Sequence, residues 1–218
     1  QDQRNGHADI YAQKLSPAGA RLWASDQRLN TDGGTFEQTT PSFSLAADGA
    51  TFAAVWEDQR NGDLDVYAQR YDGSGAPQWA ADLRVNSDTG AATQAEPVVA
   101  FLPDGNLVVV WEDNRNGAND IYLQRLSSAG VKLLTYDVRI NGNTTGDQQN
   151  PEVTLNTAGQ LVVVWQDNSS GNYDIRAAVY SGGDPQAVTP VGNVTFTLRG
   201  AKRIGENPVL SKYSQTQT

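Results

Sequence analysis

The chain has 218 residues with a formal net charge of -9, and hydrophobic residues make up 38% of it. The negative charge disfavours contact with nucleic acid or anionic lipid, and the absence of cysteine excludes disulfide bridges and thiolate metal sites. Because of this charge we expect no nucleic-acid partner. No apolar run approaches the roughly 20 residues that cross a bilayer, so we also expect no membrane insertion.

The first element in the chain is a turn with two aspartates, Asp-x-x-x-Gly-x-x-Asp. It recurs four times at intervals of 54 to 56 residues, and a proline and an Arg-aliphatic pair recur in the same register. The three sets are Asp2, Asp58, Asp113 and Asp167; Pro41, Pro97, Pro151 and Pro208; and Arg28-Leu29, Arg84-Val85, Arg139-Ile140 and Arg203-Ile204. Markers that keep one order and nearly one spacing indicate an internal repeat of about 55 residues.

Each repeat divides into four predicted strands. Residues 97–102 precede a Pro-Asp-Gly turn and the apolar run 107–111, which is typical of a β-hairpin. This run and its counterparts are continuously apolar, which indicates a strand covered on both faces. A third strand is predicted at 120–125, and a fourth ends at 137–140.

Four short strands in each of several repeats predict an all-β fold, a four-bladed β-propeller in a single domain over residues 1–218. The repeat units are about 1–40, 41–96, 97–150 and 151–207. The first unit lacks the apolar strand before its turn, whereas Asn207–Ser211 matches the first strand of a unit. We therefore expect one blade to be split between the N- and C-termini, with residues 208–218 as its closing strand or as a strand exchanged with another copy.

The sequence order in Pro41–Tyr67 and Pro97–Tyr122 is Pro-x-apolar, Asp-Gly, an apolar run, and then Asp-x-Arg-x-Gly-x-x-Asp-aliphatic-Tyr. It resembles the propeller repeats of the TolB type and their secreted bacterial relatives. It departs from them in the Trp-Glu-Asp or Trp-Gln-Asp that ends the apolar strand, where the family usually has serine, and in its longer units. The resemblance implies a propeller fold in a secreted or cell-surface protein. Family members serve as scaffolds, binding modules or peptidase gates, so the resemblance names no function.

The paired aspartates of the turn are candidate metal ligands. Calcium takes about six to eight oxygen ligands, and the turns offer two carboxylates each, an Asn amide in three copies and a glycine that lets the backbone curl. The candidate calcium ligands are Asp2, Asn5, Asp9, Asp58, Asn61, Asp65, Asp113, Asn116, Asp120, Asp167 and Asp174. An arginine inside three of the turns argues against a metal. In the alternative, the first Asp caps the turn, the arginine pairs with a carboxylate, and the second Asp opens the next strand.

Aromatic and catalytic candidates are few. Trp56, Trp111 and Trp165 end the apolar strands and fit either packing between sheets or a row of platforms for sugars. The single histidine, His7, is a turn residue, which leaves little basis for a Ser-His-Asp triad. A glycosidase-like pair of carboxylates is conceivable because Glu57 and Glu112 occupy equivalent positions, but Gln1 and Gln166 stand there in the other copies.

These observations predict a non-enzymatic extracellular module, structural or self-assembling, that calcium stabilises and that strand exchange joins to other copies. The alternative is a glycan- or protein-binding propeller, a lectin-like adhesion module. A glycoside-active enzyme is the third interpretation. The expected partners are copies of the chain itself, through the terminal strands, and glycans.

Overall fold

The computed structural model describes residues 1–156 and 159–180 as strands, turns and irregular segments. No helix occurs among these residues, which confirms the all-β class, and none of them could therefore span a membrane as a helix. The described strands are β1 (Tyr11–Ala12), β2 (Gln27–Arg28), β3 (Gln38–Leu45), β4 (Phe52–Asp58), β5 (Asp65–Tyr71), β6 (Leu83–Arg84), β7 (Gln94–Phe101), β8 (Leu107–Asp113), β9 (Asp120–Leu126), β10 (Val138–Arg139), β11 (Gln148–Leu155), β12 (Leu161–Asp167) and β13 (Asp174–Tyr180).

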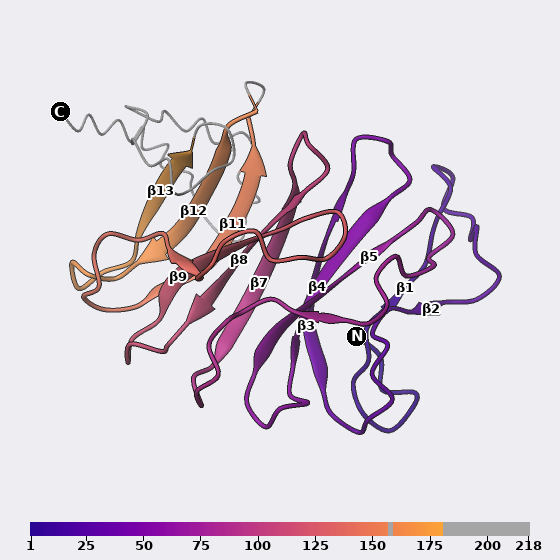
Figure 1. Cartoon of the computed structure of the whole chain (residues 1–218), viewed down its shortest axis with the longest axis horizontal. Helices are drawn as coiled ribbons and strands as arrows, with labels where there is room; N and C mark the ends of the chain where they lie inside the picture. Colours follow the sequence, from indigo (N-terminus) through magenta and orange to yellow (C-terminus); the bar gives the residue numbers. More distant parts are fainter. Residues whose placement is uncertain (157–158, 181–218) are drawn as a thin grey trace, which may run out of the picture.

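The strands form antiparallel sheets in which each strand pairs with the next one along the chain (Figure 1). Two sheets have four strands, β3-β4-β5-β6 and β7-β8-β9-β10, while β11-β12-β13 form a third sheet and β1 pairs with β2. Each sheet corresponds to one sequence repeat, so β3, β7 and β11 are equivalent first strands. The predicted unit of four strands is confirmed in the two complete sheets.

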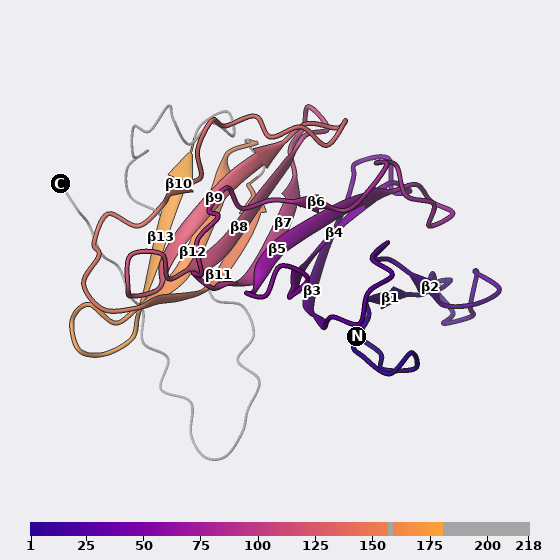
Figure 2. The same cartoon turned by 60° about the horizontal axis from the view of Figure 1, so that its bottom comes forward.

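The sheets stand one behind another in the manner of propeller blades (Figures 1 and 2). Their first strands lie side by side, because β7 contacts β3 on one side and β11 on the other. The short strands β6 and β10 form the opposite edges of their sheets. An inner line of first strands therefore runs through the molecule, and the sheet arrangement is consistent with a β-propeller.

The apolar second strands are buried on both faces. In β8, Val109 and Trp111 pack with Val55 of the preceding sheet, whereas Val108 and Val110 pack toward the following sheet. All five side chains are fully buried. Alternate residues of β12 are half-buried, because no described sheet covers its outer face. The continuous apolar runs thus have the two-sided packing that the sequence predicts.

The tryptophans that end the second strands are core residues. Trp56 and Trp111 are 0% exposed and Trp165 is 7% exposed. Each belongs to an apolar cluster between neighbouring sheets. The packing interpretation of these residues is therefore confirmed, and they do not form a row of exposed platforms for sugars.

Each first strand has a bulge at the residue before its proline. These residues have positive φ angles of 48° at Thr40, 49° at Glu96 and 51° at Asn150. Side chains other than Asn, Asp or Gly adopt this left-handed conformation at a cost of roughly 1–2 kcal/mol. The bulge also lets the strand begin earlier than the apolar pattern indicates, since β7 starts at Gln94 rather than at Pro97.

The closure of the ring stays a prediction. The strand that was expected in residues 208–218 lies outside the described residues. Strands β1 and β2 correspond to the third and fourth strands of a unit, as the sequence register indicates. The number of blades, the single domain and the unit boundaries are untested.

The bulge predicts a difference between two substitutions at Asn150, whose φ is 51°. Asn150→Gly accepts this conformation, so its free energy of unfolding should lie within about 1 kcal/mol of the parent protein. Asn150→Val places a β-branched side chain there and should cost about 1–2 kcal/mol more than the glycine variant. Urea unfolding of both proteins measures the difference. Equal stability would show that the backbone angle is not a constraint.

Candidate functional site

The first aspartate of the repeated turn binds the arginine two residues later. Oδ1 of Asp58 accepts hydrogen bonds from the backbone N and from Nε of Arg60, both at 2.9 Å, and Nη2 of Arg60 donates to Oδ2 at 2.6 Å. The indole Nε1 of Trp56 also donates to Oδ2, at 3.1 Å. Equivalent contacts join Trp111, Asp113 and Arg115 in the next unit.

The turn arginine also stacks on a tyrosine and reaches a second carboxylate. The guanidinium of Arg60 lies 4.1 Å from the ring centroid of Tyr67, and its Nη2 lies 3.1 Å from Oδ2 of the buried Asp82. Burial acts to lower the pKa of Arg60, but Asp58 and Asp82 together raise it, so the guanidinium stays charged. The same set recurs as Arg4, Tyr11 and Asp26, and as Arg115, Tyr122 and Asp137.

The second aspartate of the turn is held by amides and by an arginine. Asp65 accepts hydrogen bonds from Nδ2 of Asn61 at 2.6 Å and from Nδ2 of Asn86 at 2.8 Å, and Nη2 of Arg84 lies 2.6 Å from its Oδ1. The amide contacts recur at Asp9 and Asp120. The turn asparagine directs its NH2 group, and not its oxygen, at this carboxylate. A calcium ion shared by the two side chains would need the oxygen on that side.

The candidate calcium ligands of the first three turns therefore have protein partners. Asp2, Asp58 and Asp113 bind arginine, Asp9, Asp65 and Asp120 bind asparagine amides, and these amides include Asn5, Asn61 and Asn116. A calcium ion would have to displace these donors. In residues 1–156 and 159–180, no group of three or more His, Asp and Glu side chains is arranged to hold a metal ion. Calcium binding stays a prediction, and turn chemistry accounts for the observed contacts.

The last turn differs from the other three. Ser169 stands where they have arginine, and its backbone N donates to Oδ1 of the buried Asp167 at 2.9 Å. Ser170 stands in place of asparagine and donates to Oδ2 of Asp174 at 3.1 Å. Asp174 is exposed. This turn therefore keeps both predicted aspartates without the internal arginine.

A separate group of glutamates lies along the inner line of the molecule, where the first strands begin. Oε1 of the buried Glu57 accepts a hydrogen bond from the backbone N of Glu96 in the next sheet, at 2.9 Å. Oε2 of Glu57 accepts hydrogen bonds from the hydroxyls of Thr39 and Thr40, at 2.9 and 2.8 Å. Glu57 thus ties its own sheet to the bulge of the following sheet.

Glu112 makes the equivalent contact one unit later. Its Oε1 accepts a hydrogen bond from the backbone N of Asn150 at 2.6 Å, and its Oε2 accepts one from Nδ2 of Asn119 at 2.9 Å. The side chain is buried, with only 6% of the residue exposed. Glu57 therefore lies in the sheet that precedes Glu96, whereas Glu112 lies on β8, which pairs with the strand β7 that carries Glu96.

The electrostatics of this group raise the pKa values of Glu96 and Glu112. Burial raises the pKa of Glu112 in spite of the hydrogen bond from Asn150, and the charges of Glu96, Glu57 and Asp147 raise it further. Glu96 is only partly shielded from water, and this partial burial, followed by the charge of Glu57, raises its pKa. Glu96 is exposed, so it is a solvent-facing acid beside two buried carboxyls. Such an arrangement keeps a proton on a carboxyl to higher pH than usual, and an exposed carboxyl of this kind can pass that proton to a bound molecule.

Sequence reasoning identified Glu57 and Glu112 as a conceivable carboxylate pair but missed Glu96. In the equivalent bulges the residue is Thr40 or Asn150, so Glu96 belongs to no repeated motif. The sequence signal that was available is that the residue before the repeated proline is acidic in one described unit and uncharged in the other two. Glu96 thus lies at a bulge of β7 that the turn motif does not include.

No protein-family model matches the chain, and no curated protein is similar to it. Solved structures are similar over much of the chain. An endo-arabinase from Bacteroides thetaiotaomicron is 15% identical with a TM-score of 0.48, over 80% of this chain and 66% of that chain. A family 117 glycoside hydrolase from Zobellia galactanivorans is 10% identical with a TM-score of 0.46, over 79% of this chain and 57% of that chain.

An exo-β-1,3-galactanase from Phanerochaete chrysosporium is 17% identical with a TM-score of 0.44, over 77% of this chain and 39% of that chain. The chain spans less than two thirds of the length of these structures. These comparisons do not confirm the TolB-type resemblance.

The functional prediction from the sequence needs correction. It was a non-enzymatic structural or self-assembling module, or alternatively a lectin-like adhesion module, and the chain was not expected to be an enzyme. The similar structures are an endo-arabinase, a glycoside hydrolase and a galactanase, and this finding contradicts the prediction of a non-enzymatic module. The sequence reasoning weighed positions that recur in the repeats, so it did not consider Glu96, an acid that occurs in one unit and lies beside Glu57 of the preceding sheet. With identities of 10–17%, the activity of this chain is a matter for proposal.

The buried arginine clusters predict a large loss of stability for Arg115→Ser, which copies the last turn. The substitution leaves the buried carboxylates of Asp113 and Asp137 without their shared cation. Such a loss costs about 3–5 kcal/mol. Arg176→Ser is the matched control, because that guanidinium is 40% exposed and 3.9 Å from Asp174, so its removal should change stability by less than about 1 kcal/mol. Chemical unfolding tests both, and equal effects would contradict the structural role of Arg115.

Proposed function

We propose that this chain processes glycans by cleaving glycosidic bonds, with Glu96 as the proton donor. The observation that carries the proposal is the group of Glu57, Glu96 and Glu112, in which the pKa values of Glu96 and Glu112 are raised. Cleavage of a glycosidic bond commonly uses one carboxylic acid that protonates the leaving oxygen and a second carboxylate that activates water. Two acidic groups with shifted pKa values in one region are suited to this chemistry.

The exposure of each glutamate assigns its part in the reaction. Glu96 is exposed and can touch a substrate. It gives its proton to the leaving oxygen as the bond to the anomeric carbon breaks, and a water molecule that loses a proton to the ionised carboxylate of Glu112 adds to that carbon. Glu57 is a positioning residue, because it holds the backbone N of Glu96 and its charge raises the pKa of that carboxyl.

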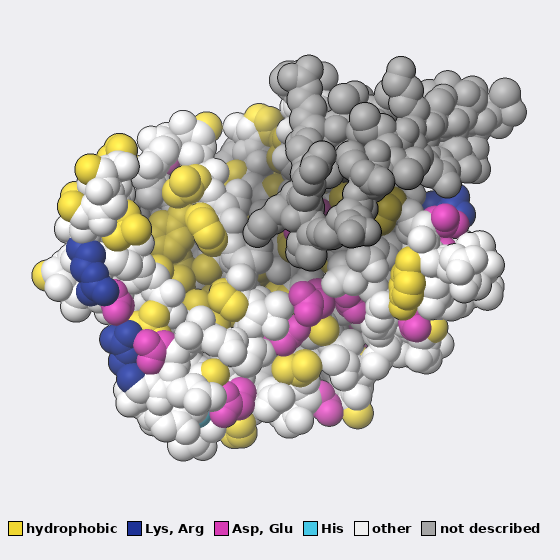
Figure 3. All heavy atoms as spheres, turned by 180° about the vertical axis from the view of Figure 1, so that it is seen from behind, with side chains coloured by type: hydrophobic (Ala, Val, Ile, Leu, Met, Phe, Trp, Pro, Cys, Tyr) yellow, Lys and Arg dark blue, Asp and Glu magenta, His cyan; other side chains and the backbone are white. Residues whose placement is uncertain are grey.

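The charge of the molecule favours neutral glycans as substrates. The net charge is -9, and Asp and Glu side chains gather near the middle of the face shown in Figure 3. An acidic surface repels polysaccharides that carry carboxylate or sulfate groups. A secreted or cell-surface location would bring the protein to polysaccharides, in keeping with the relatives that the sequence resembles.

The proposal includes the complete propeller expected from the sequence, with four blades and TolB-like repeats. The side-by-side arrangement of β3, β7 and β11 supports it, because first strands surround the axis in such a ring. In a closed ring the bulge that carries Glu96 would lie beside this axis.

Removal of the proton donor tests the reaction. Glu96→Gln should lower the hydrolysis rate of arabinan or β-1,3-galactan by at least about 100-fold, since an amide cannot donate an acidic proton. Release of reducing sugar measures the rate. The matched control is Glu152→Gln, which changes an exposed glutamate on β11 and should leave the rate unchanged. Hydrolysis by Glu96→Gln at the parental rate would disprove the assignment, as would the absence of hydrolysis across a panel of neutral polysaccharides.

The raised pKa of Glu96 predicts a pH effect for Glu57→Gln. A proton donor must be protonated, so the rate should fall as pH rises through the pKa of Glu96. Removing the charge of Glu57 lowers that pKa, and the descending limb of the kcat profile should move to lower pH. The amide oxygen of the glutamine can still accept the hydrogen bond from the backbone of Glu96. A purely structural role would change KM or stability and leave the position of this limb unaltered.

A further inference from the structure

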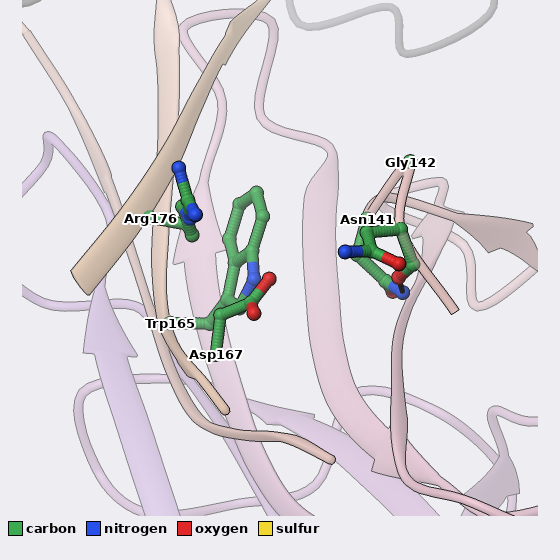
Figure 4. Close-up of a pocket in the computed structure, with 6 residues that line it drawn as sticks. Asn141, Gly142, Trp165, Asp167 and Arg176 are labelled. Carbon is green, nitrogen blue, oxygen red and sulfur yellow. Dashed lines mark hydrogen bonds between the residues drawn. The ribbon is translucent and has the colours of Figure 1, made fainter. Parts of the chain in front are cut away.

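The last repeated turn lines a pocket. Its volume is about 340 Å³, and Figure 4 shows the two sides that form it. The loop after β10 contributes one side, and strands β12 and β13 contribute the other. The lining residues are Asn141, Gly142, Asn143, Trp165, Asp167 and Arg176.

The pocket coincides with two departures from the repeat. At the preceding junction, Arg115 binds Asp113 and stacks at 4.3 Å on the ring of Tyr122. In the last unit Ser169 stands at the position of Arg115, and Arg176 stands at the position of Tyr122. The turn has therefore lost the guanidinium that covers the aspartate elsewhere, and a new guanidinium borders the pocket from β13.

Trp165 brings an unsatisfied hydrogen-bond donor to this pocket. The residue is 7% exposed, and its buried Nε1 has no hydrogen-bond partner among the described residues. The equivalent nitrogens of Trp56 and Trp111 donate to their turn aspartates at 3.1 Å. Figure 4 shows the indole of Trp165 beside the carboxylate of Asp167, across the pocket from Asn141. An acceptor supplied here would remove the free-energy cost of a buried, unpaired N–H group.

The charges around the pocket select the class of ligand. An anion would meet the carboxylate of Asp167, which is 4% exposed, and a cation would meet the guanidinium of Arg176. The indole and the guanidinium only donate hydrogen bonds, whereas the carboxylate only accepts them. A neutral molecule with adjacent hydroxyl groups can satisfy both kinds of partner, since each hydroxyl donates and accepts.

We infer that this pocket is a subsite for one residue of a neutral sugar, held by Asp167, Arg176 and Trp165. The choice of a sugar among neutral polyols rests on the proposed glycan-processing function. The volume lies at the small end of the range of about 300–1,000 Å³ that is usual for ligand sites, which suits a single ring. Its lining residues do not include Glu57, Glu96 or Glu112, so the subsite would hold a part of the glycan that does not react.

Binding can be followed at the indole N–H of Trp165 by NMR, with its signal assigned from Trp165→Phe. The probes are D-galactose, L-arabinose, D-xylose and D-glucose, each added alone to the whole chain. At least one sugar should shift the Trp165 signal in a saturable way. Asp167→Asn should weaken this binding about tenfold or more, as expected for the loss of a hydrogen bond to a charged group.

Ser169→Arg provides the sharpest variant, because it restores the residue present in the other three turns. The new guanidinium should cover Asp167, abolish the sugar-dependent shift and leave the protein folded. If Ser169→Arg does not fold, the test uses Asp167→Asn and Trp165→Phe instead. Calorimetry then measures sugar binding to both variants, which should be weaker than binding to the parent protein. A sugar shift that persists unchanged in Ser169→Arg and Asp167→Asn would overturn the inference.

Two further results would also overturn it. The first is no shift of the Trp165 signal with any of the four sugars. The second is a shift with L-arginine amide or inorganic phosphate but with none of the sugars. The Glu96→Gln variant separates this inference from the proposed hydrolysis. It should bind sugar at Trp165 with unchanged affinity even though it does not cleave glycans. Binding without hydrolysis in the parent protein would reject the catalytic proposal alone, and hydrolysis without a Trp165 shift would reject the subsite alone.

Discussion

The arrangement of the inner line depends on one contact between neighbouring sheets, a buried glutamate that accepts the backbone N–H of a bulge residue. Glu57 makes this contact to Glu96, and Glu112 makes it to Asn150, over distances of 2.9 and 2.6 Å. The contact satisfies a backbone donor that the bulge removes from the β-ladder. It also fixes the position of a residue in the left-handed region, where the side chain departs from the alternation of the strand. The direction in which Glu96 leaves β7 is therefore set by a side chain of the preceding sheet.

The polar clusters of the turns show how a repeated sequence buries charge. An arginine between two carboxylates, stacked on a tyrosine, occurs in each of the first three turns. The clusters of the second and third turns are costly to break, because removal of the arginine leaves side chains of 0% exposure, Asp82 and Asp137, without their cation. The two functional candidates both lie where a repeat is interrupted, at Glu96 and at Ser169. Repetition supplies the scaffold, and a single departure from it leaves a group whose charge or hydrogen-bonding capacity the scaffold does not use.

Much of the fold could be predicted because it follows from local patterns that recur. The continuous apolar runs specified strands with two buried faces, and the turn spacing specified sheets of consecutive antiparallel strands. The buried Trp56 and Trp111 follow from the same pattern. The start of β7 and the role of Glu96 could not be predicted in this way, since both depend on a bulge and on a partner 39 residues away. The turn aspartates were found, but which ligand faces them depends on the orientation of Arg60 and Asn61, which spacing alone does not give.

The identity of the residue that ties the sheets together bears on function. Glutamine stands at this position in Gln1 and Gln166, and an amide oxygen can accept a backbone N–H as a carboxylate does. A carboxyl at Glu112 has a cost, because a raised pKa means that its contribution to folding is present at low pH and is lost as pH rises through that pKa. The sheet that precedes Glu96 and the sheet that carries it nevertheless both have glutamate at this position, in Glu57 and Glu112. Sheet packing alone does not require this charge, whereas the charge of Glu57 adds to the effect of burial in raising the pKa of Glu96.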